Sequence, residues 1–323
     1  MVEQEVIGVD AGATWIKGAR YSAELELLQE IKQASAAAEG SVAYFDAIAE
    51  VVAALAPEEG VPVGLSLPAL LSRDSKTILA MANVTDLQTG DQPQVVKDIF
   101  TERLKTAQFV VQNDAHCAAR AEWKLGWGSG EVSRSLLHLT WGTGIGVGFV
   151  VEGLVQYGWE AGHLPVSWEA ADWRCGCGST VDLEALIAVP RLVEQARAAV
   201  TAGIVATKIT LPELADIREA PKLLSQRASS GDALAQQILG EALTWMARGL
   251  LGMSVISFPD RVTIGGAMMA SDWLLETLRE AIEANRQGFV SRALEARQVQ
   301  RAKLGNEAGR VGAAWLALQA FSR

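Results

Sequence analysis

Hydrophobic positions along the chain fall into short runs that alternate with longer stretches of helical spacing. Short apolar runs typical of buried strands occupy residues 6–9, 61–67, 109–112, 135–140 and 262–264. Helical spacing is found over residues 42–56, 115–125, 182–198, 232–258, 272–297 and 309–321. Because strand, loop and helix alternate, the pattern predicts an α/β protein in which helices pack on a sheet.

Two strands of this pattern enter turns rich in glycine and threonine. Residues 6–21 and residues 137–151 both consist of a strand, a Gly/Thr turn and a second strand, with an interval of about 130 residues. The later copy continues through the two-residue turn Glu152-Gly153 into another short strand, as in a β-hairpin. A duplicated fold with one such turn on each side of a nucleotide would produce this repeat.

The later turn has glycine at every second position, at Gly142, Gly144, Gly146 and Gly148. Such a loop lets the backbone approach an anion and direct N–H groups at it, although a plain tight turn has the same composition. The spacing differs from the G-x-G-x-x-G of dinucleotide-binding proteins, and a hairpin follows instead of a helix. The sequence contains no P-loop motif. A phosphate site here must therefore belong to another class.

The earlier turn places Asp10 at the end of a buried strand, beside Gly12 and Thr14. A carboxylate in this place can hold Mg²⁺, directly or through water, while Gly12 and Thr14 contact phosphate. The alternative is an Asx-turn residue that ends the strand.

Asn113 and Asp114 end another strand, immediately before a helical stretch. Asp114 in this position can act as a general base that takes the proton of a substrate hydroxyl, with Asn113 orienting the substrate. The alternative is that Asp114 is the N-cap of the helix.

Four possible metal ligands, His163, Cys175, Cys177 and Asp182, follow the pattern H-x11-C-x-C-x4-D. Zn²⁺ takes a tetrahedral set of thiolate, imidazole and sometimes carboxylate ligands. The alternative is two buried thiols beside an unrelated histidine and aspartate, but C-x-C in a reducing compartment favours metal. We therefore expect a zinc site.

Glu160 and Glu184 flank this cluster. A loop tied down by metal would present both carboxylates to sugar hydroxyls, whereas the usual place of a glutamate is the solvated surface.

The composition and net charge of the chain argue against some classes of binding partner. The 323 residues suit two compact lobes. The net charge of −10 argues against a nucleic acid as partner. The acidic start at residues 1–5 predicts no signal peptide, and no apolar run reaches the ~18 residues of a membrane span. Three cysteines give no disulfide framework. We expect a cytoplasmic protein that binds neither nucleic acid nor membranes.

Taken in order, these segments resemble the motifs of the ROK family of sugar kinases and sugar-responsive repressors. IGVDAGAT at residues 7–14 resembles its first phosphate motif, QNDA at 112–115 its catalytic segment, and GTGIG at 142–146 its second phosphate motif. EAGH at 160–163 matches its E-x-G-H element, and CGCG at 175–178 begins its zinc motif. IGGA at 264–267 resembles its adenosine-side turn, and residues 304–314 its C-terminal stretch. The resemblance covers nearly the whole chain.

This resemblance implies a two-lobed actin-like ATPase fold of the ribonuclease H-like kind, with a nucleotide and sugar cleft between the lobes. The small lobe would comprise residues 1–115 and a C-terminal helix at 306–323, and the large lobe residues 116–305. The resemblance further implies that ATP and Mg²⁺ phosphorylate a hydroxyl of a hexose or amino-hexose, as in glucokinases, in a cytoplasmic homodimer.

The resemblance also implies a role for each motif residue. Asp114 would be the general base. The sugar ligands would be Asn83, Asn113, Asp114, Glu160, His163 and Glu184. The phosphate contacts would be Gly12, Thr14, Gly142, Thr143 and Gly144, with Asp10 near the Mg²⁺ and Gly265 and Gly266 on the adenosine side. His163, Cys175, Cys177 and Asp182 would hold a structural Zn²⁺ that organises the loop carrying Glu184 toward the sugar.

The sequence departs from the family pattern at several positions. Ala13 and Trp15 flank Thr14 where the family usually has glycine and lysine, and Ala69 follows Pro68 where glycine is usual. Asp182 replaces the last cysteine of the zinc motif. Such a site should hold Zn²⁺ less tightly than a site with three cysteines.

Two other functions are considered. A sugar-responsive repressor of this family carries a DNA-binding helix-turn-helix before the first phosphate motif, which here begins at residue 6. A non-catalytic sugar-binding protein would explain Ala13, Trp15 and Asp182, but Asp10 and Asp114 are retained. The motifs are compatible with ATP or polyphosphate as donor and with more than one hexose.

Overall fold

The structure is a computed structural model that describes residues 4–55, 60–81, 83–88, 90–128 and 133–321. The chain divides into two compact units. The first unit comprises residues 1–126, 148–158 and 306–323, and the second comprises residues 127–147 and 159–305. Residues 1–3 of the acidic start, Ala56 at the end of the first predicted helix, and Ala82 lie outside the described residues.

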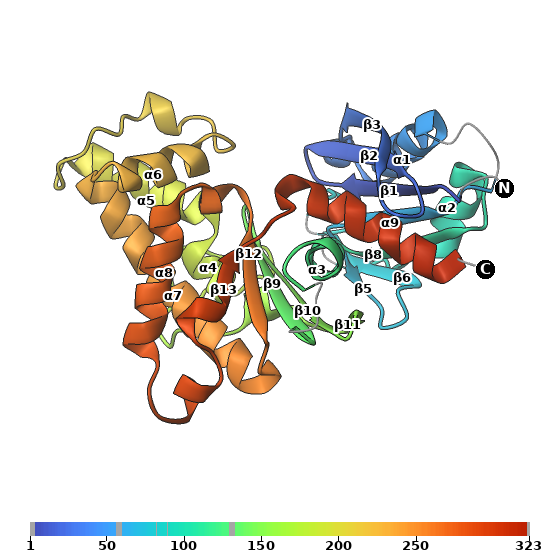
Figure 1. Ribbon diagram of the computed structural model, residues 1–323. Helices are drawn as coiled ribbons and strands as arrows, with labels where there is room; N and C mark the ends of the chain where they lie inside the picture. Colours follow the sequence, from blue (N-terminus) through green and yellow to red (C-terminus); the bar gives the residue numbers. More distant parts are fainter. Residues whose placement is uncertain (1–3, 56–59, 82, 89, 129–132, 322–323) are drawn as a thin grey trace. The chain divides into compact units, whose positions relative to one another are not determined.

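The first unit is built on a five-stranded sheet with the order β3-β2-β1-β4-β8 (Figure 1). These strands are β1 (Val6–Ala11), β2 (Trp15–Tyr21), β3 (Leu27–Ala34), β4 (Val63–Leu67) and β8 (Phe109–Asn113). β1 pairs antiparallel with β2 and parallel with β4, and β4 pairs parallel with β8. A small sheet holds β5 (Leu70–Leu71), β6 (Thr77–Ala80) and β7 (Gln94–Val95).

Helices cover both faces of this sheet, because side chains alternate along β1. Ile7 and Val9 belong to a buried cluster that includes Tyr44 and Ile48 of α1 (Ser41–Leu55). Gly8, between them, faces α9 (Ala308–Phe321), and an added Cβ there would overlap the helix backbone. The unit also contains α2 (Val96–Leu104) and α3 (Asp114–Leu125). The first sheet is therefore the middle layer of its unit.

The second sheet has the order β11-β10-β9-β12-β13. Its strands are β9 (Ser135–Trp141), β10 (Ile145–Val151), β11 (Leu154–Gln156), β12 (Arg261–Gly265) and β13 (Val299–Arg301). β12 pairs parallel with both β9 and β13, and β10 pairs antiparallel with β11. The helices of the second unit are α4 (Leu183–Ile187), α5 (Val189–Ala202), α6 (Ala220–Ser229), α7 (Ala233–Ser257) and α8 (Asp272–Asn285).

The two sheets share one topology. Numbered by chain order within each sheet, both run 3-2-1-4-5. In both, the second and third strands are antiparallel, and the first strand is parallel to the fourth. The repeat predicted from residues 6–21 and 137–151 is the start of each copy. The structure therefore extends a faint sequence repeat to two whole sheets.

Two predicted helices differ in extent from the structure. The stretch 182–198 is divided, because Ala188 is extended and Pro190 stands in the first turn of a new helix, α5. The stretch 272–297 is α-helical only as far as Asn285; Arg286 is extended, Gly288 has a φ of +57°, and short 3-10 helices follow at Gly288–Arg292 and Ala296–Gln298. The hydrophobic pattern continues through both breaks, so it did not predict them.

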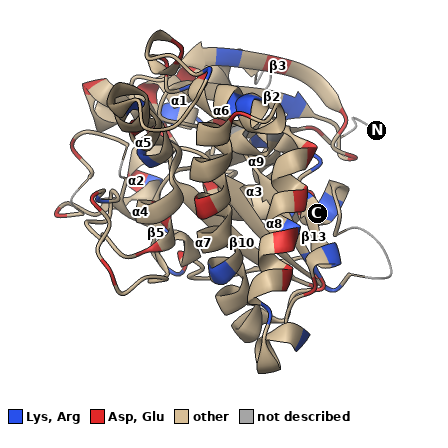
Figure 2. Cartoon of the chain, turned by 90° about the vertical axis from the view of Figure 1, so that its left-hand side faces the viewer, with Lys and Arg blue, Asp and Glu red and all other residues tan. Residues whose placement is uncertain are grey.

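In the view of Figure 2, the described basic residues are spread over several elements, with acidic residues among them. Among the described residues, no helix has both the length and the apolarity needed to span a membrane.

Candidate functional site

The carboxyl ends of three parallel strands bring several predicted site residues to one edge of the first sheet. Asp10 on β1 lies opposite Ser66 on β4, and Ser66 lies opposite Gln112 on β8. Asn113 ends β8, and Asp114 begins α3. Open α/β sheets bind their ligands beyond this edge. Asp10, Asn113 and Asp114 are therefore gathered where a ligand of the first unit is expected.

Asp10 is a carboxylate among polar and charged neighbours. The Ser66 hydroxyl donates to Asp10 Oδ1 over 3.1 Å. Burial raises the pKa of Asp10, whereas Lys17, the Ser66 hydrogen bond and Arg310 lower it. A divalent cation beside Asp10 would favour the ionised form that burial opposes. The surroundings of Asp10 therefore fit the Mg²⁺ of a nucleotide.

The turn after β1 holds Gly12 and Thr14. The Gly12 N–H donates to the Trp15 carbonyl over 3.0 Å, and the Thr14 side chain is exposed. Trp15 is 40% exposed, and the Lys32 ammonium group of β3 lies 4.3 Å from its ring centroid. A cation–π pair therefore lies next to this turn, at the position where the family usually has lysine.

Asn113, not Asp114, is the N-cap of α3. Asn113 Oδ1 accepts a hydrogen bond from the His116 N–H over 3.1 Å, and Asn113 Nδ2 donates to the Ala69 carbonyl over 3.2 Å. The alternative interpretation of Asp114 as the cap is therefore wrong. Asp114 is half-buried, and its Oδ1 accepts from the Ala115 N–H over 2.8 Å.

Asp10 and Asp114 both act on one buried hydroxyl. The Tyr44 hydroxyl donates to the Ala11 carbonyl. Burial raises the pKa of Tyr44, and the negative charges of Asp10 and Asp114 raise it further. The two carboxylates therefore lie within electrostatic range of the same group, as a shared site requires. Asn83, the remaining predicted residue of this unit, lies in an exposed turn between β6 and β7.

In the second unit, the turn at residues 142–144, which we call the glycine turn, joins β9 to β10. The Gly142 N–H donates to the Gly144 carbonyl over 3.0 Å, and Thr143 is exposed. Glu184 Oε2 accepts from the Ile145 N–H over 2.8 Å. A Cβ on Gly144 would lie only 2.6 Å from the same oxygen. Glycine at residue 144 is therefore required by the carboxylate that lies against it.

A second turn lies at the same edge of this sheet. Gly265 ends β12 opposite Thr140 of β9. Gly266 has a φ of +99°, and a Cβ there would overlap the Trp141 carbonyl. Close by in sequence, Ser271 lines a cavity of about 670 Å³ together with α6. The residues lining this cavity are polar or basic apart from Leu223, and they include Lys222, Ser225, Gln226, Arg227, Ser229 and Ser230.

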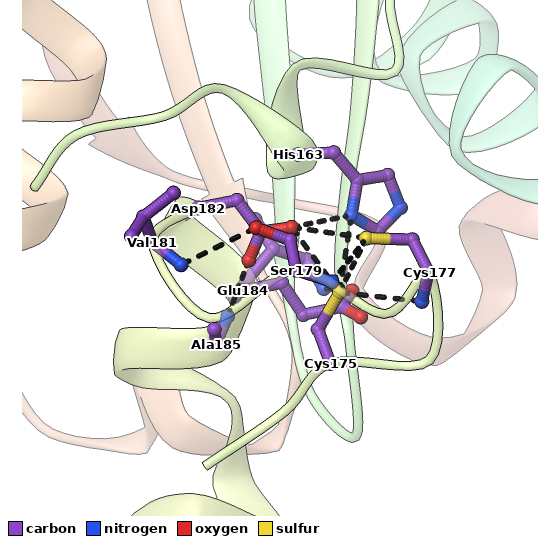
Figure 3. A network of polar contacts seen from close by, with 9 residues as sticks. His163, Cys175, Cys177, Ser179, Val181, Asp182, Glu184 and Ala185 are labelled. Atoms are coloured by element: carbon purple, nitrogen blue, oxygen red, sulfur yellow. Dashed lines mark hydrogen bonds and ion pairs between the residues drawn. The ribbon is translucent and has the colours of Figure 1, made fainter. Parts of the chain in front are cut away.

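The four predicted metal ligands converge in the second unit (Figure 3). Their ligand atoms all lie within 4.8 Å of one another. Asp182 Oδ2 is 3.1 Å from Cys175 Sγ, 3.2 Å from Cys177 Sγ and 3.2 Å from His163 Nδ1. Ligands around a tetrahedral zinc ion are separated by roughly 3.3–3.8 Å. The 3.7 Å between Cys175 Sγ and His163 Nδ1 falls in this range, whereas the two sulfurs lie 2.7 Å apart and would have to separate by about 1 Å around the ion.

The chemistry of these donors also fits a cation. Asp182 has no exposed surface, and its Oδ2 accepts hydrogen bonds from the Cys175 and Cys177 thiols and lies 3.2 Å from His163 Nδ1. Burial raises the pKa of Asp182, but hydrogen bonds from the Ala185 N–H and the two thiols lower it below the usual value. A metal ion would replace the thiol protons and satisfy the same carboxylate oxygen.

Glu160 is close to this cluster and to Glu184. Removal of water by neighbouring atoms raises the pKa of Glu160, although its side chain as a whole is exposed. His163 lowers this pKa and Glu184 raises it. Both glutamates are therefore electrostatically coupled to the region of the metal cluster.

Three residues that interact with Asp10 were missed by the sequence analysis. They are Ser66, Lys17 and Arg310. Only Ser66 carried a signal: it is the one polar residue of the run Val63–Leu67 and is fully buried. Lys17 and Arg310 come from β2 and from α9, and only the folded sheet brings them near β1.

Two sheets of one topology, each with a glycine-containing turn after its first strand, define a two-lobed α/β protein of the actin-like kinase type. The chain belongs to the ROK family, whose model matches residues 6–320. It is 26% identical to a glucokinase of Halalkalibacterium halodurans, over 99% of this chain and 96% of that protein. It is 29% identical to a glucokinase of Streptomyces coelicolor, over 96% of both chains.

A solved structure with the same fold covers nearly all of the chain. The crystal structure of a ROK family glucokinase from Streptomyces griseus, in complex with glucose and AMPPNP, matches with a TM-score of 0.78 and 27% identity. The match covers 98% of this chain and 99% of that one. The two-lobed α/β fold expected from the sequence is thereby confirmed.

Proposed function

We propose that this protein is a glucokinase-like sugar kinase that transfers a phosphoryl group from ATP to a hydroxyl of a hexose or amino-hexose. The observation that carries the proposal is the pair Asp10 and Asp114 at the carboxyl edge of the first sheet. Phosphoryl transfer depends mainly on positioning and charge stabilisation, which a held carboxylate and N–H-rich turns supply. The glucokinases among the relatives support the same activity.

In this mechanism Asp114 accepts the proton of the sugar hydroxyl while the hydroxyl oxygen attacks the γ-phosphorus of ATP, and the bond from that phosphorus to the bridging oxygen breaks to release ADP. Capping by Asn113 fixes the start of α3, and therefore the position of Asp114. Asp10 would hold the Mg²⁺ of the nucleotide, and that ion would neutralise charge on the phosphates. Gly12 and Thr14 contact phosphate from the same edge.

The second unit would contribute the remaining contacts. In the glycine turn, Thr143 and Gly144 offer their backbone N–H groups to the donor phosphates, and Gly142, whose N–H donates to the Gly144 carbonyl, lets the chain approach the phosphates closely. Gly265 and Gly266 pass beside the adenosine, and the polar cavity lined by α6 and Ser271 has room for a nucleobase and ribose.

The proposed sugar ligands are Asn83, Asn113, Asp114, Glu160, His163 and Glu184. We further propose a structural Zn²⁺ on His163, Cys175, Cys177 and Asp182, since their geometry and chemistry fit the ion. The homodimer that the resemblance implies stays a prediction.

A coupled assay of ADP release over a panel of hexoses and amino-hexoses tests the activity, with polyphosphate as an alternative donor. The variant Asp114→Asn should lower turnover by roughly 10²–10⁴-fold. Its stability should not change, because Asn113 provides the helix cap. Asp91→Asn, at an exposed acidic residue of the same unit, is the matched control and should keep full activity.

Near-normal turnover of Asp114→Asn would refute the assignment of the base. If no sugar is phosphorylated with either donor, but calorimetry detects sugar binding, the protein is a non-catalytic sugar-binding member of the family instead.

A further inference from the structure

We infer that the metal site also braces the glycine turn, and that Asp182 is the positioning residue that connects them. The inference rests on the proposed function only in taking residues 142–144 as the donor-phosphate contact. Its starting point is that the two carboxylate oxygens of Asp182 have different partners (Figure 3). Oδ2 meets the three other metal ligands, and Oδ1 accepts from the Ala185 N–H over 2.8 Å.

The hydrogen bond from Ala185 makes Asp182 the N-cap of α4. α4 has only five residues, and a helix of this length is not stable without outside support. Because Asp182 is completely buried, water cannot replace its carboxylate as the cap. A metal ion that fixes Asp182 therefore also fixes the start of α4.

α4 and the first residue of α5 are in turn bonded to the glycine turn and its flanking residues by three hydrogen bonds. Glu184 Oε2 accepts from the Ile145 N–H over 2.8 Å. The Val189 N–H donates to the Gly142 carbonyl over 2.9 Å. Trp141 Nε1 donates to the carbonyl of Ile187 over 2.7 Å. α4 is thus connected to the residues before and after the turn, and the start of α5 to the turn itself.

The segment that carries His163 packs on Ile145, the residue that follows the glycine turn. Gly162, which precedes the histidine, lies so close to the Ile145 carbonyl that an added Cβ would overlap it. Two segments that carry metal ligands therefore contact Ile145: the segment that ends at His163, and α4, which follows Asp182. Loss of the metal should loosen both segments together.

This arrangement explains why residue 182 is an aspartate where the family usually has a cysteine. A cysteine at residue 182 would present one sulfur, a weak hydrogen-bond acceptor, to both the metal and the helix. A carboxylate divides the two tasks between two oxygens. The weaker affinity for zinc is accompanied by a stronger cap.

Hydrogen exchange measured by mass spectrometry tests the inference without any need for turnover. Zinc is removed from the whole protein with a chelator, and exchange is followed in peptides that contain the amides of Ile145 and Val189. Both amides should exchange about tenfold faster without zinc, because each depends on an acceptor or a helix that the metal holds in place. Exchange in β1, in the other unit, should not change. Added Zn²⁺ should restore the original rates.

Two variants separate the steps of the connection. Asp182→Asn keeps an oxygen for the cap but loses the anionic ligand, so it should lose zinc and exchange like the chelated protein. Glu184→Ala leaves all four metal ligands in place. It should retain zinc, while the Ile145 amide exchanges fast whether or not zinc is present.

Zinc-free wild-type protein that protects Ile145 and Val189 as well as the loaded protein does would overturn the inference. Elemental analysis that finds no zinc in protein purified without chelator would overturn it as well. Failure of the proposed function gives a different result: exchange still depends on zinc, but no sugar is phosphorylated. If the turn meets the donor phosphates, zinc removal should also weaken AMPPNP binding several-fold in calorimetry.

Discussion

Two buried histidines should make the protein sensitive to mild acid, and His138 offers the sharpest test. His138 lies on β9, where its Nδ1 is 2.9 Å from the Thr263 hydroxyl and its Nε2 is 3.2 Å from the Thr140 hydroxyl. Burial lowers the pKa of His138 from 6.5 to about 4. Burial, followed by the charge of Arg120, lowers the pKa of His116 to about 4 as well. The perturbation is the substitution His138→Gln, which keeps a polar side chain that cannot take up a proton.

Acid lowers the free energy of unfolding if the unfolded state binds the proton more readily than the folded state does. Below pH 6.5 the unfolded chain protonates its imidazole, whereas the folded protein resists protonation until about pH 4. The stability contributed by neutral His138 is therefore complete above pH 6.5 and is lost progressively as the pH falls from 6.5 to 4. Between pH 7.5 and pH 5.0, each buried histidine should cost about 2 kcal/mol of the free energy of unfolding.

Urea unfolding followed by circular dichroism at the two pH values measures this loss. His138→Gln should lose about 2 kcal/mol less than the wild type, and the double variant with His116→Gln about 4 kcal/mol less. If the two units unfold in separate transitions, His138→Gln should affect the second unit and His116→Gln the first. A His138→Gln variant as sensitive to acid as the wild type would show that His138 does not cause the loss of stability.

Two further predictions concern close approaches of the backbone. Gly312→Ala would place a Cβ into the Cys117 carbonyl, so it should lower the free energy of unfolding by about 2 kcal/mol or more. The control is Gly240→Ala, because Gly240 is a helical glycine with open space around it. In the same urea experiment this control should be neutral or stabilising. Gly309→Ala would place a Cβ 2.5 Å from Asp10 Oδ1 and should raise the Mg²⁺ concentration needed for half-maximal ADP release, with little effect on the KM for sugar; an unchanged Mg²⁺ dependence would contradict the role of Asp10.

The sequence predicted those features whose signal lies within one segment. The glycine turn and the metal ligand set were of this kind, because composition and spacing carry them. β3 was missed since most of its residues are exposed, so they show no alternation of hydrophobic and polar positions. The break at Ala188 was missed because apolar residues continue on both sides of it. Helical periodicity reports a buried face, and it does not report a change of axis between two helices.

Contacts that depend on the register between paired strands could not be predicted from the sequence. Asp10, Ser66 and Gln112 become neighbours only when β1, β4 and β8 pair in one particular register. The N-cap of α3 is a second feature that the sequence did not predict. Asn113 and Asp114 are both good N-cap residues, and the structure alone shows that the helix uses Asn113.

The position of α9 has a consequence for how the protein is made. This helix lies against β1 and β4 at Gly8 and Gly64, in the unit that also holds residues 1–126 (Figure 1). During translation, residue 308 is added 182 residues after residue 126. At the usual rate of bacterial and eukaryotic synthesis this delay is about 10–35 s.

Throughout that interval the nascent first sheet lacks the helix that covers one of its faces. The second unit, by contrast, has all of its residues once residue 305 has been added. We therefore expect neither unit to complete its fold until nearly the whole chain has been made, and the uncovered face of the first sheet to be a target for chaperones until then.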